Sequence, residues 1–407
     1  MQLKLLLRVP ARNFHISYGK SVASVNNILN EGQNEIQTQA QAHEHKLKMS
    51  GWQIHNYGDF DELLFSDRLK VPQIKQSNEC LVKVQATSIN PIDVAMLGGY
   101  GAAVLKVLRC QPNVIEFPLT LGREFCGTLI QNGMSVNNFK LPVGQRVWGV
   151  VPVQSTQGAH AQYVRVPDYC VGMVPEILTN TEAASVLYAG LTAWSGIYLT
   201  AQLGGVCGAL TADGGGANKR VLVLGGSGAV GSLAIQILRA QGSQVLATCS
   251  ENATELVQNL GADCVIDYRN PSKMATLRNF APYDLVLDCS GQGSEAAETL
   301  DFKYDQYVTF SSPLLRNIDS SGVGLGLLKN FANILEANVK SLTNSKGLIK
   351  YGFFIPAPQG IELLKQLVER KKLLPLIDSC YKFEELPEAF KRVKAGHLRG
   401  KVVVTLD

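Results

Sequence analysis

The stretch 220–240 constrains the fold of this chain more than any other part of the sequence. It opens with the apolar run 221–224, a pattern typical of a strand buried on both faces of a parallel sheet. The sequence Gly-Ser-Gly-Ala-Val-Gly at 226–231 follows at once, and apolar residues then recur at helical spacing through 230–238. The glycines therefore lie at a turn from strand to helix, and the apolar run 244–249 closes a βαβ unit of about 30 residues.

Glycines at such a turn predict a dinucleotide site. The first glycine allows the tight turn, the second lets the backbone approach a pyrophosphate, and the third lets the helix pack closely on the strand. The free amides of the new helix then face the anion. A glycine turn that packs a helix without any ligand stays open as an alternative. An ATP-type loop is disfavoured because Ser232-Leu233 stands where Lys-Ser/Thr is required. The three glycines predicted to form this site are Gly226, Gly228 and Gly231.

Strand-like and helix-like segments alternate after this turn, which predicts an α/β fold with a Rossmann-type, doubly wound parallel sheet. The segment 49–166 instead shows short strands with frequent turns and predicts a second, mostly β domain. One helix, 181–199, is expected to lead from that domain into the nucleotide domain. The later apolar runs expected to be strands are 264–266, 285–288, 307–310 and 350–355.

Composition bounds the cellular setting. Residues 1–30 are basic, contain serines and carry no acidic residue, which is the composition of a mitochondrial transit peptide; a merely basic tail is the alternative. A polar linker follows, so 1–48 is assigned to transit peptide and linker. The nine cysteines are scattered without a CxxC pair, as expected in a reducing compartment. No apolar run reaches the ~20 residues of a membrane span, and a net charge of +4 gives no reason to expect nucleic acid.

A set of short motifs adds a family resemblance that runs over the chain from about residue 50 to the C-terminus. The motifs are Asn-Pro-Ile-Asp at 90–93, Leu-Gly-Arg-Glu at 121–124, Ala-Gly-Leu-Thr-Ala-Trp at 189–194, Gly-Gly-Ser-Gly-Ala-Val-Gly at 225–231, Leu-Gly-Ala-Asp at 260–263, Val-Ile-Asp-Tyr at 265–268 and Gly-His-Leu-Arg-Gly-Lys at 396–401. Together they resemble the quinone-oxidoreductase branch of the medium-chain dehydrogenase/reductase superfamily.

The resemblance implies a GroES-like substrate domain built from both chain ends, a Rossmann domain between them, and NADPH in the cleft. In these terms 49–181 is the GroES-like domain, 182–356 the Rossmann domain, and 357–407 the return to the substrate domain. A homodimer and a reticulon-like protein partner are also implied. The cofactor contacts implied at matching motif positions are Ser227, Ala229, Val230, Ser250, Tyr268, Gly291, Phe310, Gly352, Phe354, His397, Leu398 and Arg399, with Gly352 and Phe354 in the last strand.

The residues themselves bear on cofactor choice and on metals. In NAD sites an acidic residue near the end of the second strand binds the ribose hydroxyls. Here that strand ends in Thr248-Cys249-Ser250, whose hydroxyls can donate to a 2′-phosphate, and this favours NADPH unless Glu251 faces inward. Arg123 stands where zinc-dependent relatives carry histidine, and a guanidinium is no metal ligand. Since clustered Cys/His ligands are lacking as well, no metal is expected.

Without zinc, hydrogen bonds must activate the substrate while the nicotinamide supplies hydride. Tyr100 is the candidate for the oxyanion donor or the proton donor, and Asn90 for positioning substrate or nicotinamide through its amide. A loop tyrosine that merely covers the pocket, and an asparagine that merely forms a turn before Pro91, stay open as alternatives.

These expectations favour an NADPH-dependent oxidoreductase of the mitochondrial matrix that reduces a quinone or an enone, and the resemblance links it to ubiquinone biosynthesis. An enoyl-thioester reductase is a second hypothesis, since the same fold and cofactor deliver hydride to a conjugated double bond. An NADPH-bound scaffold or sensor that acts through protein contacts is the third.

Overall fold

The computed structural model describes residues 48–109, 116–203 and 217–406, and from residue 49 onward these belong to one compact unit. The predicted transit peptide and linker, 1–48, lie outside the described residues except for Lys48. Most of the glycine-rich stretch before β8 (Arg220–Leu224) lies outside them as well.

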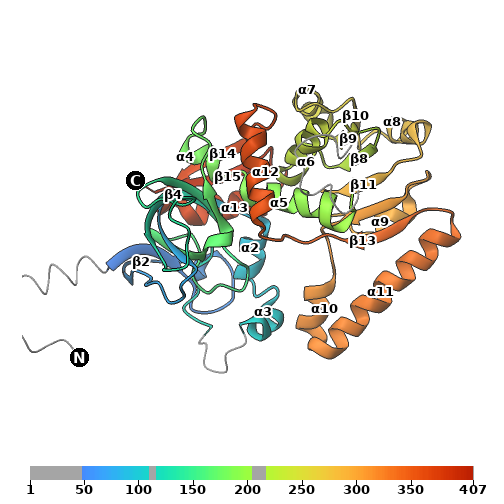
Figure 1. Cartoon of the computed structure of the whole chain (residues 1–407). Helices are drawn as coiled ribbons and strands as arrows, with labels where there is room; N and C mark the ends of the chain where they lie inside the picture. The colour runs from blue at the N-terminus through green and yellow to red at the C-terminus, as the bar shows by residue number, and fades with distance from the viewer. Residues whose placement is uncertain (1–47, 110–115, 204–216, 407) are drawn as a thin grey trace, which may run out of the picture. The chain divides into compact units, whose positions relative to one another are not determined.

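The first sheet has seven strands and joins segments from both ends of this unit. Its order is β14-β15-β3-β4-β5-β7, with β6 pairing β3. Because β15 pairs with both β3 and β14, the last strands complete a sheet that begins early in the chain; Figure 1 shows them in red beside the blue and green strands. The strands are β3 (Glu79–Ile89), β4 (Glu124–Asn132), β5 (Arg146–Val150), β6 (Tyr163–Pro167), β7 (Val171–Met173), β14 (Ile377–Lys382) and β15 (Lys401–Thr405).

Smaller elements accompany this sheet. β1 (Lys48–Gln53) pairs with β2 (Leu64–Lys70), and α2 (Pro91–Leu97) and α3 (Ala102–Leu108) follow β3. In the described part of the chain, no single helix is long and apolar enough to span a bilayer; α2 and α3 meet that length and composition only as a pair bent by 96°.

The second sheet has six strands, all parallel, in the order β10-β9-β8-β11-β12-β13. Counted from β8, this is the order 3-2-1-4-5-6 of a dinucleotide-binding sheet. Its point of reversal lies between β8 and β11, where the glycine turn leaves the sheet. The remaining strands are β9 (Gln244–Cys249), β10 (Cys264–Asp267), β11 (Leu285–Asp288), β12 (Gln306–Thr309) and β13 (Leu348–Tyr351).

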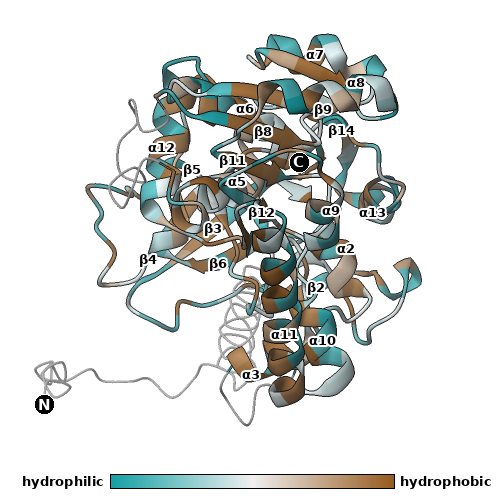
Figure 2. Ribbon diagram, turned by 90° about the vertical axis from the view of Figure 1, so that its right-hand side faces the viewer, coloured by the Kyte–Doolittle hydropathy of each residue, from teal (hydrophilic) through white to brown (hydrophobic). Residues whose placement is uncertain are grey.

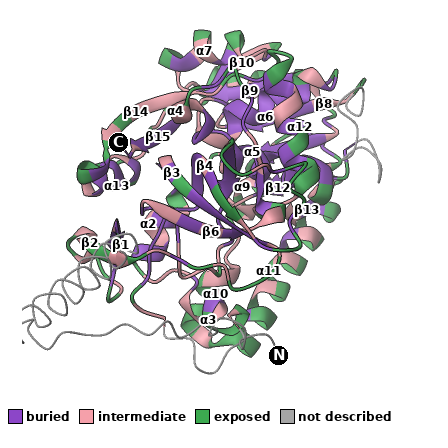
Figure 3. Cartoon of the chain, turned by 60° about the vertical axis from the view of Figure 1, so that its left-hand side comes forward, coloured by how far each residue is buried: buried purple, intermediate pink, exposed green. Residues whose placement is uncertain are grey.

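The central strands are buried on both faces, as their continuous apolar runs predict. Val221 and Val223 of β8 pack into one core cluster, whereas the alternate residues Leu222 and Leu224 pack into a second. Figure 2 shows these strands in the brown of apolar residues, and Figure 3 shows them buried between helices. The predicted α/β fold, a doubly wound parallel sheet with a mostly β second part, is confirmed.

Helices cover both faces of the parallel sheet. Helices α12 and α13 pack against strands of the mixed sheet. Helix α6 begins directly at the glycine turn, and α11, at 21 residues, runs alongside α10. The helices not yet given are α4 (Asn180–Ala183), α5 (Leu187–Trp194), α6 (Ala229–Ala240), α7 (Thr254–Asn259), α8 (Pro271–Ala275), α9 (Ser294–Thr299), α10 (Leu314–Ser321), α11 (Val323–Thr343), α12 (Pro358–Glu369) and α13 (Leu386–Lys394).

The prediction of one continuous helix over 181–199 is wrong. The structure has α4, then a break, then α5, and a π-helical turn at Ser195–Thr200. Thr179 and Glu182 form a capping box at the start of α4. At the start of α5 the backbone N–H of Tyr188 donates to the buried Glu124 carboxylate at 2.8 Å, so a carboxylate from β4 serves as the cap that the local sequence lacks.

Helix α11 contacts the rest of the unit through a narrow face. Ala337 and Ser341 are buried beneath it, whereas Leu328, Phe331 and Leu335 are each more than half exposed. Figure 3 shows this helix largely in the green of exposed residues. Many apolar side chains of α11 are therefore exposed and do not belong to the core.

His160 makes the stability of the fold depend on pH. Its ring is fully buried, and burial lowers its pKa to about 4. In the unfolded chain its pKa is about 6.5. The unfolded state therefore binds the proton first, and stability present above pH ~6.5 is lost as the pH falls toward 4, by roughly 2 kcal/mol at pH 5. Urea unfolding at pH ~7.5 and ~5 should show this loss in the wild type and a smaller one in His160→Gln. Equal losses in both proteins would contradict the assignment to His160.

Candidate active site

A cavity of about 730 Å³ gathers most of the predicted site residues. Residues around α2 and α3 form part of its wall, the turn between β8 and α6 forms another, and the turn before β15 a third. The predicted residues that line it are Asn90, Tyr100, Ser227, Gly228, Ala229, Val230, Phe310, Gly352, Phe354, His397 and Leu398. Those that do not line it are Gly226, Gly231, Ser250, Tyr268, Gly291 and Arg399. Both catalytic candidates thus face the same space as the glycine turn.

Gly231 and Gly228 of this turn differ in why a glycine suits the position. A Cβ on Gly231 would lie 2.2 Å from the carbonyl oxygen of Gly225, so only glycine lets α6 pack this closely against the turn. A Cβ on Gly228 would have no neighbour nearer than 3.6 Å, and this residue lines the cavity. As the N-cap of α6, Gly228 supplies no capping side chain, so the first amides of the helix remain available to an anion.

Three of the predicted residues that do not line the cavity lie near the C-terminal ends of β9 and β10. Ser250 follows β9, Tyr268 follows β10, and the Tyr268 amide donates to the Cys249 carbonyl at 3.1 Å. The positive charge of Arg399 acts on the same strand end, where it opposes the burial that raises the pKa of Cys249. The Glu251 side chain is 80% exposed, with its carboxylate 3.8 Å from the Lys273 ammonium. The acidic side chain that would disfavour a 2′-phosphate is therefore directed to solvent.

Asp288, which the sequence analysis did not single out, holds the loop after β11. Its buried carboxylate accepts hydrogen bonds from the backbone N–H groups of Ser290, Gly291 and Gly293 and from the Thr309 hydroxyl. Gly291 itself has φ +79°. An aspartate at the end of an apolar strand, followed by Ser and Gly, is a turn signal that could have identified this loop.

Asn90 lies at the floor of the cavity, with only 2% of its surface exposed. Its backbone N–H donates to Asp93 at 2.9 Å, so Asp93 holds the turn at the start of α2. Its side-chain oxygen accepts from the Lys401 ammonium, which also lies 3.0 Å from the Glu124 carboxylate. Neither Lys401 nor Glu124 was predicted as a site residue, because a lysine that opens an apolar strand is typical of a solvent-exposed strand end.

Tyr100 projects into the cavity from the turn between α2 and α3. Burial raises the pKa of its phenol above the usual value, so the hydroxyl remains protonated at neutral pH and can donate. Helix α10 fixes this turn, because the Asp319 carboxylate accepts from the backbone N–H groups of Gly101 and Ala103 at 2.7 and 3.1 Å.

A stacked aromatic pair forms another wall. The rings of Tyr188 and Phe354 lie 4.1 Å apart and nearly parallel, at 15°, and both line the cavity. Tyr188 was not predicted. Gly352 and Phe354 were expected within the last strand, but β13 ends at Tyr351 and both residues follow it. The chain leaves the sheet there, which carries Phe354 across to α5.

The residue at the zinc-ligand position is enclosed in the protein. Arg123 is fully buried, donates to the carbonyl oxygens of Pro152 and Ser155, each at 3.1 Å, and lies 3.9 Å from Asp93. Burial lowers its pKa, with Asp93 opposing the shift. Within the described ranges, no group of three His, Cys, Asp or Glu residues could hold a metal ion. The expectation of no metal stays a prediction.

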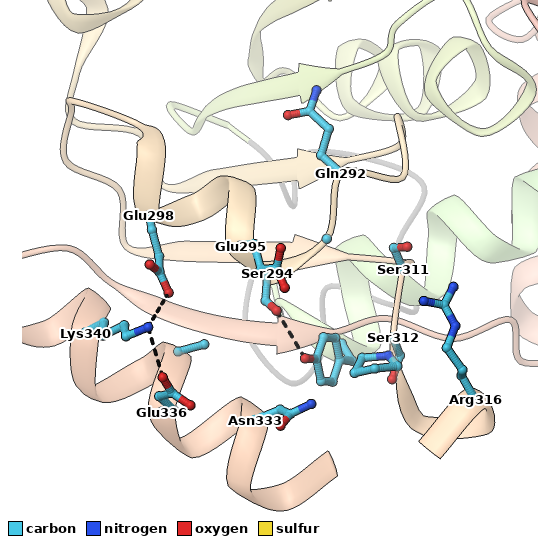
Figure 4. Close-up of a pocket in the computed structure, with 14 residues that line it drawn as sticks. Gln292, Ser294, Glu295, Glu298, Ser311, Ser312, Arg316, Asn333, Glu336 and Lys340 are labelled. Atoms are coloured by element: carbon cyan, nitrogen blue, oxygen red, sulfur yellow. Dashed lines mark hydrogen bonds and ion pairs between the residues drawn. The ribbon is translucent and has the colours of Figure 1, made fainter. Parts of the chain in front are cut away.

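A smaller cavity of about 360 Å³ lies between α9, α10 and α11 and is lined by none of the predicted site residues (Figure 4). Three of its charged side chains pair with one another. The Lys340 ammonium lies 3.4 Å from Glu298 and 3.0 Å from Glu336, and the hydroxyls of Ser294 and Tyr351 are 3.2 Å apart. We therefore assign the site to the larger cavity.

Two family models match the chain. One, described as an alcohol dehydrogenase GroES-like domain, matches residues 76–176, and the other, described as a zinc-binding dehydrogenase, matches 260–404. The first spans β3 to β7 of the mixed sheet, and the second runs from the segment before β10 into β15. The GroES-like part of the predicted fold is thereby confirmed.

Relatives match nearly the whole described unit. A Drosophila melanogaster protein named "NAD(P)H oxidoreductase RTN4IP1, mitochondrial" is 64% identical over 360 residues, which are 88% of this chain and 86% of that protein. The chain belongs to the RTN4IP1 family. A Caenorhabditis elegans family member named "Reticulon-4-interacting protein 1, mitochondrial" is 32% identical over 347 residues, 83% of this chain and 90% of that one. The resemblance predicted from the motifs is confirmed.

This member of the RTN4IP1 family shares its architecture with a solved quinone oxidoreductase. The structure of the quinone oxidoreductase from Coxiella burnetii superposes with a TM-score of 0.66 and covers 88% of this chain and 100% of its own. The two sequences are 24% identical, so this likeness shows the fold alone.

Proposed function

We propose that the chain is a zinc-independent, NADPH-dependent reductase of quinones in the mitochondrial matrix, and that it supports ubiquinone biosynthesis. As a member of its family it is an NAD(P)H-dependent oxidoreductase whose cofactor is a nicotinamide dinucleotide, and NADPH fits. Relatives named mitochondrial place it in the mitochondrion. What we propose beyond this is that the substrate is a quinone, that the compartment is the matrix, and that the reaction supports ubiquinone biosynthesis.

One observation carries the proposal: the glycine turn, Asn90 and Tyr100 line the same cavity. A pyrophosphate held by the amides at the start of α6 would direct the rest of the dinucleotide along this cavity. The nicotinamide, when bound, supplies the hydride. We propose that the remaining predicted cofactor residues, from Ser250 to Arg399, contact the dinucleotide as the resemblance implies.

The chemistry left to the protein is orientation and proton supply. Asn90 would donate its amide to an acceptor oxygen that gains negative charge as hydride arrives. Tyr100, protonated at neutral pH, would supply the proton to that oxygen. Reduction of a quinone to a quinol takes two electrons and two protons. The hydride carries both electrons and one proton, and Tyr100 supplies the second proton. Solvent then returns a proton to Tyr100.

The lining of the cavity supports a flat, apolar acceptor. Apolar side chains of α2, α3 and α10 form much of the wall, and Tyr188 and Phe354 add aromatic surface. The apolar residues on those helices are Ile92, Met96, Leu105, Leu108, Leu314 and Leu315. An uncharged ring loses water favourably in such surroundings.

We also propose the division into domains at 49–181, 182–356 and 357–407, which the pairing of β15 with β3 supports. A protein partner is a further proposal, because a relative is named for an interaction with reticulon 4. A homodimer is proposed by analogy with the superfamily.

Cofactor titration tests the function. The full chain should bind NADPH at least about tenfold more tightly than NADH, a difference of roughly 1.4 kcal/mol. Bound NADPH should then be oxidised when a short-chain quinone is added. Binding without oxidation by any quinone or enone would favour a scaffold or sensor. Oxidation by enoyl thioesters alone would favour the enoyl reductase, and no binding of either nucleotide would contradict the dinucleotide site.

A further inference from the structure

A buried ion pair adjoins the cavity. The Lys401 ammonium and the Glu124 carboxylate are 3.0 Å apart, with side chains 4% and 0% exposed. Lys401 also lines the cavity, and the residue before it, Gly400, forms a backbone bridge to Gly228 of the glycine turn. A charge pair in this place is costly to bury, so it calls for a reason beyond stability.

Glu124 is held by several donors. One carboxylate oxygen accepts from the Ser88 hydroxyl at 2.6 Å and from Lys401, and the other accepts from the Tyr188 amide at 2.8 Å. These contacts come from β3, β15 and the start of α5. The carboxylate thereby fixes the place of the Lys401 ammonium.

The contact between Lys401 and Asn90 fixes the orientation of the Asn90 amide. The Lys401 nitrogen lies 2.5 Å from the Asn90 side-chain oxygen. An ammonium has three donors and no acceptor, so the atom that faces it must be oxygen and not the amide nitrogen. The orientation, usually ambiguous for asparagine, is decided here by chemistry.

The other end of this amide has no partner. The Asn90 Nδ2 atom is buried and makes no hydrogen bond in the described protein, although Asn90 lines the cavity. A buried donor without a partner is costly, and at a residue that lines a cavity the missing acceptor can come from a bound molecule.

We propose that Lys401, held by Glu124, is a positioning residue that turns the Asn90 amide so that Nδ2 donates to a carbonyl oxygen of the bound acceptor. The inference rests on the proposed function, because the acceptor carbonyl is that of the quinone. It deepens that function by naming the group that recognises the carbonyl and the pair that orients it.

A double-mutant cycle tests the inference. Lys401→Met combined with Glu124→Gln removes both charges at once, which avoids leaving either one buried alone. This pair variant should reduce kcat/KM for the quinone about tenfold while the Kd for NADPH changes less than about threefold. In an Asn90→Ala background, the same pair of changes should have almost no further effect. An undiminished effect in that background would overturn the positioning role, as would full activity of the pair variant.

Two further variants show whether a loss of activity comes from misfolding or from the removal of charges in general. Arg165→Met with Glu79→Gln neutralises another partly buried pair, 3.4 Å apart, whose residues do not line the cavity, and should keep the activity. Asn90→Asp keeps the shape and the contact with Lys401 but has no N–H to donate, so its activity should fall as in Asn90→Ala. Wild-type activity in Asn90→Asp would overturn the proposed donor even if the pair variant does not fold.

A spectroscopic readout separates this inference from the function. With selective ¹⁵N-asparagine labelling, the Asn90 side-chain amide signal should shift when a quinone is added to the wild type with NADP⁺, and should not shift in the pair variant. An unchanged wild-type signal would overturn the inference alone, whereas a wild type that reduces no quinone would contradict the proposed function and the inference with it.

Discussion

Replacing Gly228 by alanine is expected to weaken NADPH binding by about 10- to 100-fold, which corresponds to the loss of one or two hydrogen bonds to a charged group. The added methyl meets no protein atom nearer than 3.6 Å, so the fold has room for it. It would project toward the cavity, where the pyrophosphate must approach the amides of α6. Fluorescence titration gives the Kd, and urea unfolding should show a loss of no more than about 1 kcal/mol.

Two other glycines provide the controls for this prediction. Gly231→Ala should lose both NADPH binding and about 1–3 kcal/mol of stability, because its methyl would meet the Gly225 carbonyl at 2.2 Å. Gly324→Ala on α11 has open space around it and should change neither binding nor folding adversely. Unchanged affinity in a folded Gly228→Ala variant would contradict the assignment of the glycine turn to the pyrophosphate.

Tyr100→Phe is expected to lower kcat for quinone reduction by about 100-fold or more, the usual contribution of a positioned proton donor. The substitution keeps the ring that covers the cavity and removes only the hydroxyl. NADPH affinity should stay nearly unchanged, so the loss appears in kcat measured at saturating cofactor. A variant with wild-type kcat would leave Tyr100 as a lining residue.

Tyr57→Phe is the matched control. Tyr57 belongs to the same region, and its ring would be the nearest neighbour of a side chain at Gly99, but its hydroxyl donates to Glu116 and it does not line the cavity. Loss of the Tyr57 hydroxyl should lower the free energy of unfolding by about 1 kcal/mol and leave kcat unchanged. Because burial raises the pKa of the Tyr100 phenol above its usual value, the wild-type rate should not fall through neutral and mildly alkaline pH, where the phenol stays protonated.

Features encoded by neighbouring residues could be predicted from the sequence. The glycine turn between β8 and α6 depends on a few consecutive residues, and the continuous apolar runs of the parallel strands reflect burial on both faces. The motif set identified the family, and with it the candidates Asn90 and Tyr100. Local signals were weaker for element bounds: the pattern 181–199 gave no sign of the break between α4 and α5, because the cap at that break comes from Glu124, far away in the chain.

Charge pairing could not be predicted in the same way. Lys401 and Glu124 meet across the mixed sheet only because β15 pairs with β3, and nothing in the residues around either one indicates the other. The same holds for Tyr188 and Phe354, whose rings stack because the chain leaves the sheet after β13 and crosses to α5. Contacts of this kind depend on long-range topology, which period and spacing do not encode.

The sequence by itself therefore determined the parallel sheet, the position of the glycine turn between β8 and α6, and the family, since each follows from short runs of neighbouring residues. Only the tertiary structure decided that Glu251 is directed to solvent, that the Lys401 ammonium lies against Glu124 and the Asn90 side-chain oxygen, and that the Asn90 Nδ2 atom is buried without a hydrogen-bond partner among the described residues. The physical reason is that a side chain's orientation, burial and hydrogen-bond partners are set by segments that meet only once the chain has folded.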